Sequence, residues 1–145
     1  MKQFIFSAAL LLTLSLSSSY ASPVPGDEDK TERNFKKTFP TAECIKWSTE
    51  GDYRKVSFVL YGRGAQALFS PQGDLLGTVR NVFYSDMPIK VMMAIKKRFD
   101  NATPFAITEI NRLEGTEYRF TIEVKNNRYE ATISPDGNFN RVSNK

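Results

Sequence analysis

The side chains that most enzymes use for acid–base and nucleophilic chemistry are scarce in this chain. Its 145 residues include no His, one Cys and one Trp. Without His there can be no Ser-His-Asp triad, no Cys-His dyad and no His-based zinc site. A single Cys excludes an intrachain disulfide, a CxxC redox pair and a four-Cys metal site. We therefore predict no metal site and no cofactor.

Pairs of carboxylates are the main catalytic groups that remain. The candidates on or near expected strands are Glu109, Glu114, Glu117, Glu123 and Glu130. Most of them have basic neighbours and alternate with apolar residues, a pattern typical of solvated sheet positions. The segment Gly62-Arg63-Gly64 lacks the Lys-Ser/Thr and the following helix of a phosphate-binding loop. We therefore predict that the protein is not an enzyme.

A binding function would instead require a sheet face that is unusually apolar. The period-two pattern of residues 53–61 and 66–68 brings aromatic and aliphatic side chains onto one face, whereas the equivalent face in the second half of the chain is charged. Amphipathic aromatics with aliphatic neighbours are typical of interface centres. The predicted partner-binding residues are Tyr53, Lys55, Val59, Tyr61 and Leu68.

Three occupants of this face remain open at the level of sequence: an external protein, the other half of the chain, or a second copy in a homodimer. A second class of function is also open, in which the protein carries a small apolar ligand or a peptide. The pocket for such a passenger would be lined by Met92, Met93, Phe83 and Phe105. The net charge of +4 is small and scattered, so we expect no nucleic-acid partner.

The chain opens with the pattern of an export signal. A positive start at Lys2 precedes an apolar run, and small residues occupy Ser19 and Ala21. We predict a signal peptide over residues 1–21, cleaved after Ala21. Its apolar core is shorter than the roughly 20 residues that a membrane-spanning helix needs. The expected location is therefore periplasmic or secreted, with no membrane anchor after cleavage. Residues 22–30 carry two Pro, one Gly and three acids, which predicts a flexible leader.

An internal repeat organises the rest of the chain. Residues 35–39, FKKTF, are matched by residues 95–99, IKKRF, and residues 67–74, ALFSPQGD, by residues 131–138, ATISPDGN. Two matched blocks in the same order predict two copies of one supersecondary unit. We place repeat 1 at residues 31–84 and repeat 2 at residues 85–145, both in one compact domain.

Each repeat is expected to open with a helix. In the first, Asp29 can cap the helix, Phe35 and Phe39 share one face, and Pro40 ends it. In the second, which follows Pro88, the expected core stripe is Ile89, Met92, Ile95 and Phe99.

Period-two alternation predicts strands after each helix. Val56, Phe58 and Leu60 alternate with more polar residues, and Phe120 begins the equivalent pattern in the second half. Further strands are expected at residues 43–49, 65–70, 75–83, 107–113, 129–134 and 139–142. Ser-Pro-x-Gly turns join the last two strands of each half. The predicted fold class is α+β: two tandem repeats of a helix followed by about four antiparallel strands, with the helices packed on one sheet face. Trp47 is expected in the core, in phase with Ile45, and Cys44 is expected to be a buried, inert thiol.

These segments resemble the PepSY-like family of exported bacterial proteins, often described as beta-lactamase-inhibitor-like. The similarity runs from about Thr31 to the end of the chain and includes FKKTFPTA, the IKW strand, SPQGDLL, MPIKVMMAIKKRF and SPDGNF. It implies a non-enzymatic periplasmic protein that binds or inhibits another protein through its sheet surface. No residue that contacts a lactamase can be carried over, because no matching inhibitor motif is present.

Overall fold

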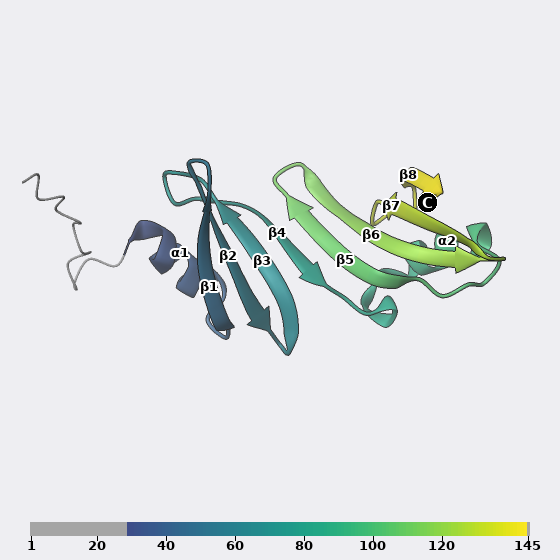
Figure 1. Ribbon diagram of the computed structural model, residues 1–145, viewed down its shortest axis with the longest axis horizontal. Coiled ribbons are helices and arrows are strands. Elements are labelled where there is room, and N and C mark those ends of the chain that lie inside the picture. Colours follow the sequence, from purple (N-terminus) through teal and green to yellow (C-terminus); the bar gives the residue numbers. More distant parts are fainter. Residues whose placement is uncertain (1–28, 145) are drawn as a thin grey trace, which may run out of the picture.

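Two helices, eight strands and one 3-10 turn make up residues 29–144, the part of the chain that this computed structural model describes (Figure 1). The elements are α1 (Lys30–Thr38), β1 (Glu43–Glu50), β2 (Tyr53–Leu60), β3 (Arg63–Phe69), β4 (Leu75–Asn81), η1 (Tyr84–Asp86), α2 (Ile89–Arg98), β5 (Phe105–Arg112), β6 (Gly115–Val124), β7 (Asn127–Ile133) and β8 (Phe139–Asn144). The predicted signal peptide and residues 22–28 of the predicted leader lie outside the described residues. None of the helices in the described part is both long and apolar enough to cross a membrane.

A single antiparallel sheet contains all eight strands in sequence order, which makes the fold α+β as expected. The pairing of β4 with β5, from Gly77 opposite Arg112 to Asn81 opposite Thr108, joins the four strands that follow α1 to the four that follow α2. We call this pairing the seam. Because the halves meet edge to edge, neither covers the sheet face of the other.

Both helices pack on the same face of the sheet, and each has its own core. In the first half, Phe35 of α1 lies among side chains of β2 and β3: Val56, Phe58, Ala65, Ala67 and Phe69. In the second half, Val91 and Ile95 of α2 pack on side chains of β5, β6 and β7: Ile107, Tyr118, Phe120, Ile122, Ala131 and Ile133. No helix covers the opposite side of the sheet in the described part of the chain, and we call that side the open face.

Local sequence accounts for the start of α1. The Asp29 carboxylate accepts a hydrogen bond from the Thr31 backbone N–H at 3.3 Å, so the predicted cap is confirmed. Asp29 and Lys30, which we assigned to the leader, therefore belong to the helix and its cap. Arg54 of β2 forms ion pairs with both Asp29 and Glu32, and these tie the helix to the sheet.

The core stripe of α2 differs from the predicted one. Ile95 and Phe99 are buried as expected, but Ile89 is 70% exposed and Val91 takes its place in the core. The reason is helical geometry: residues four apart lie on one face, whereas Ile89, six residues before Ile95, lies about 120° around the helix from it.

A bulge at the start of β1 overturns one further prediction. Trp47 packs against Phe35 and Phe69 at ring-centroid distances of 5.4 and 6.1 Å, which confirms its place in the core. Cys44, however, is exposed, as is Ile45. The register shifts between Glu43 and Lys46, and Cys44 adopts a positive φ of 53°, so strict alternation fails there.

The two Ser-Pro-x-Gly turns have the same hydrogen bonds. The backbone N–H of Ser70 donates to the backbone carbonyl of Asp74 at 2.9 Å. The backbone N–H of Ser134 donates to the backbone carbonyl of Asn138 at the same distance, 2.9 Å. Gly137 has a φ of +86°, and a Cβ added to it would lie 2.9 Å from the Lys90 carbonyl oxygen of α2. The glycine therefore allows the turn to approach the helix closely.

Gly137→Ala is expected to lower the free energy of unfolding by about 2 kcal/mol, and urea denaturation measures this. About half of that cost is the strain of a non-glycine residue in the left-handed conformation, and the rest is the steric clash of the new Cβ with α2. Gly62→Ala is the matched control, because Gly62 has a φ of +74° but nothing within 4 Å of an added Cβ. We expect about 1 kcal/mol there. Equal losses for the two variants would show that the approach to α2 carries no cost.

Candidate functional site

The open face contains a groove of about 600 Å³ that runs along the seam. Its apolar side chains come from three strands and one turn: Leu68 of β3, Leu76 and Val79 of β4, Ile110 of β5, and Leu113 after β5. Leu113 is 82% exposed, whereas Ile110 is only 5% exposed although no helix covers it. The groove therefore has an apolar floor and an apolar side chain at its mouth.

The register across the seam explains why the face is hollow at this point. Gly77 lies opposite both Leu68 and Arg112, so a position without a side chain sits between two long side chains. A Cβ at Gly77 would lie only 2.7 Å from the backbone oxygen of Asn111. Gly77 therefore both permits the close pairing of the two halves and leaves the floor of the groove open.

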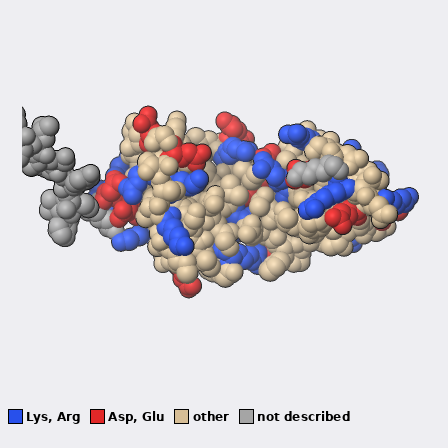
Figure 2. All heavy atoms as spheres, viewed as in Figure 1, with Lys and Arg blue, Asp and Glu red and all other residues tan. Residues whose placement is uncertain are grey.

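Charged side chains surround the apolar floor. Lys55 pairs with Glu50 at 3.0 Å, and Arg112 pairs with Glu117 at 3.0 Å. Arg119 lines the same groove and also a neighbouring hollow of about 240 Å³. Figure 2 shows a broad area of uncharged residues between scattered Lys and Arg side chains.

The structure brings only part of the predicted site together. Lys55 and Leu68 line the groove. Tyr53 and Val59 lie on the open face along β2, beyond the residues that line the groove. Tyr61 lies in the turn after β2, where a φ of 50° interrupts the alternation, and it lines a different cleft.

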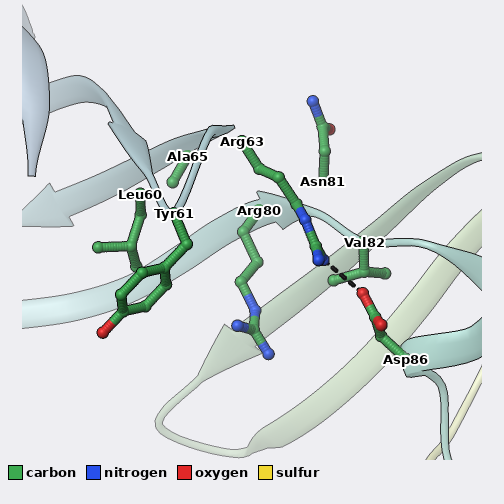
Figure 3. Close-up of a pocket in the computed structure, with 8 residues that line it drawn as sticks. All are labelled: Leu60, Tyr61, Arg63, Ala65, Arg80, Asn81, Val82 and Asp86. Carbon is green, nitrogen blue, oxygen red and sulfur yellow. Dashed lines mark hydrogen bonds and ion pairs between the residues drawn. The ribbon is translucent and has the colours of Figure 1, made fainter.

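That cleft lies between the two halves on the helix side of the sheet and has a volume of about 240 Å³ (Figure 3). Arg63 forms an ion pair with Asp86 and holds the pKa of that carboxyl below its usual value, with help from the Phe83 backbone N–H. The Arg63 guanidinium also lies 4.3 Å from the centroid of the Phe83 ring. These contacts link the start of β3 to η1 and the residue before it, so we interpret the cleft as a joint between the halves.

Glu109 of β5 occupies the helix side of the seam. It accepts hydrogen bonds from Arg80 Nε at 2.9 Å and Arg80 Nη2 at 3.0 Å, and a third from Asn111 Nδ2 at 2.9 Å. Burial alone would raise the pKa of Glu109, but the hydrogen bonds and charge of Arg80 and the hydrogen bond from Asn111 hold it below its ordinary value. Burial and, to a smaller extent, the Glu109 carboxylate raise the pKa of Tyr118. Glu109 is thus held ionised as a structural partner of Arg80.

The residues predicted to line a carrier pocket do not form one. Met92 packs against the core of the second half. Phe83 and Met93 have exposed side chains in η1's flanking segment and in α2. Phe105 is exposed on the open face, opposite Thr121 and beside Arg128, so the predicted pocket was wrong. Within residues 29–144, no group of three or more His, Cys, Asp or Glu side chains could hold a metal ion.

Solved structures share this arrangement of helices and strands. A protein from Bacteroides eggerthii, provisionally described as periplasmic, has a TM-score of 0.68 at 22% identity, over 81% of this chain and 88% of its own. A DUF2874 family protein from Bacteroides uniformis has a TM-score of 0.68 at 18% identity, over 82% and 90%. A BLIP-like protein from Bacteroides fragilis has a TM-score of 0.68 at 19% identity, over 84% and 89%.

The fold is BLIP-like. At these identities the similarity extends to the BLIP-like fold alone, because function depends on the residues of a site. No family model and no curated protein matches the sequence. In this BLIP-like fold the groove lies on the face that the helices leave uncovered.

Proposed function

We propose that this is an exported, non-enzymatic protein of the PepSY-like kind that binds or inhibits another periplasmic or secreted protein through its open face. The signal-peptide pattern of residues 1–21 and the provisionally periplasmic neighbour support the location. The BLIP-like fold supports binding by a sheet surface. The scarcity of catalytic side chains favours binding over turnover.

The observation that carries the proposal is the apolar groove at the seam. Val79 and Leu113 are exposed on a face that no described helix covers, next to the predicted residues Lys55 and Leu68. Apolar side chains in a concave site with a charged rim are typical of the centre of a protein interface. The floor is wide and open, which suits a protein surface better than an enclosed small molecule.

We also propose that the fold arose from two copies of one unit, residues 31–84 and 85–145. Equivalent bulges support this, because the register shifts between Glu43 and Lys46 in β1 and between Phe105 and Thr108 in β5. The shared hydrogen bonds of the two Ser-Pro-x-Gly turns give further support. Under this proposal the groove lies where the two copies meet, so one unit alone would lack it.

Val79→Lys tests the groove by placing a charge on its floor. We expect the variant to lose at least tenfold in affinity for the partner that the wild type captures from the native cell envelope. Ile89→Lys is the matched control, because Ile89 is an exposed apolar residue on the helix side of the molecule. Binding is measured by calorimetry, after circular dichroism shows that both variants fold.

Equal binding by the wild type and Val79→Lys would contradict the proposed surface. Organic extraction of the purified protein, followed by mass spectrometry, tests the alternative of a carrier. A stoichiometric apolar passenger would favour carriage, whereas a clean protein would favour the interface.

A further inference from the structure

Positive charge without a compensating partner lies beside one end of the groove. Arg119 of β6 and Arg141 of β8 are both exposed, and neither forms an ion pair within residues 29–144. The other two cations that line the groove are paired, since Lys55 binds Glu50 and Arg112 binds Glu117. Arg119 and Arg141 are therefore the cations of this region that are available to an external anion.

The register places these two arginines in one row across the sheet. Arg119 lies opposite Thr132 of β7, and Thr132 lies opposite Arg141. The Cα atoms of Arg119 and Arg141 are two strand spacings apart, about 10 Å. Two arginine side chains are long enough to bring their guanidinium groups together above the Thr132 hydroxyl. Both arginines line the hollow of about 240 Å³, and Arg119 lines the groove as well. The two depressions thus adjoin at Arg119.

From these positions we propose that the groove and the Arg119–Arg141 pair together recognise an acidic segment of a protein partner. This inference rests on the proposed function and specifies the chemistry of the partner. An apolar side chain of the segment occupies the floor near Leu68, Val79 and Ile110, and a carboxylate of the same segment binds the two guanidiniums. Arginine suits this role because its planar group binds carboxylates through two parallel hydrogen bonds.

Length restricts the segment further. The path from β3 to β8 crosses five strand spacings, about 24 Å. An extended chain covers that distance in about seven residues. The expected ligand is thus an extended segment of about seven residues, apolar at one end and acidic at the other.

Synthetic peptides test this recognition by NMR titration of the labelled protein. The probe is Ac-LVSTSEE-NH2, and its neutral counterpart is Ac-LVSTSQQ-NH2. We expect shifts of backbone amides along the groove and around Thr132, and at least tenfold tighter binding of the acidic peptide. The double variant R119Q/R141Q should bind both peptides equally, whereas R128Q should keep the preference, because Arg128 lies outside both depressions.

The outcomes separate the two proposals. If R119Q/R141Q still binds the acidic peptide more tightly than the neutral one, or if the wild type binds both alike, the inference about the carboxylate is wrong. Neither result contradicts the proposal that the groove is the binding surface. Val79→Lys should lose both peptides, and retention of both would contradict the groove itself. Tighter binding of a peptide with phosphoserine in place of the glutamates would overturn the carboxylate assignment, and so would an absence of shifts at millimolar peptide.

Discussion

Phe35→Ala is expected to lower the free energy of unfolding by about 3–5 kcal/mol. Phe35 is 1% exposed, and its ring centroid lies 5.0 Å from that of Phe58 and 5.4 Å from that of Trp47. A helix of nine residues has little stability of its own, so α1 depends on this contact to remain on the sheet. Urea denaturation followed by fluorescence measures the loss, and Trp47, the single Trp, reports from within the same core.

Tyr61→Ala is the control for this variant. It also removes a large aromatic side chain, but Tyr61 is 79% exposed, so we expect a change within about 0.5 kcal/mol. If Phe35→Ala cost no more than Tyr61→Ala, the docking of α1 would not depend on the aromatic core. A smaller loss accompanied by a lower m-value would instead indicate that the first half unfolds separately.

Glu109→Gln is expected to lower the free energy of unfolding by about 2 kcal/mol at pH 7, a second large effect. The residue is 8% exposed, and the substitution leaves the Arg80 guanidinium without its charged partner across the seam. The Arg80 side chain is 47% exposed, so water solvates its charge in the variant. The cost arises at the buried carboxyl, because the Gln amide can no longer accept both hydrogen bonds from Arg80. Arg80→Met and the double variant complete a cycle that isolates the coupling between the two residues.

The pH dependence of this effect follows from the lowered pKa of Glu109. A carboxyl whose pKa is lower in the folded state contributes stability above its unfolded pKa and loses it as the pH falls through the folded pKa. The difference in unfolding free energy between wild type and Glu109→Gln should therefore shrink between pH 7 and pH 3. An unchanged difference at both pH values would mean that the variant acts through packing and not through charge.

Features that depend on neighbouring residues could be predicted from the sequence. The Asp29 cap and the Ser-Pro-x-Gly turns are examples, because their hydrogen bonds join residues within a few positions of one another. Prediction failed where the backbone leaves its regular period. Cys44 and Tyr61 both have positive φ, and neither value follows from the apolar pattern around them.

The groove could be predicted only in part. Lys55 and Leu68 belong to a hairpin whose alternation is plain in the sequence. Val79 and Ile110 face each other only because β4 pairs with β5, and patterns within one half contain no information about pairing between halves. The exposed Leu113 in the turn after β5 was a signal for this region that alternation alone did not use.

The separate cores of the two halves also have a mechanical consequence. Each helix packs on its own four strands, and a hollow remains between the halves on the helix side of the seam. We therefore expect the sheet to flex about the β4–β5 pairing, because no helix packs across it. A bulky partner would be accommodated by a change in curvature, with the opposite hollow narrowing as the groove widens.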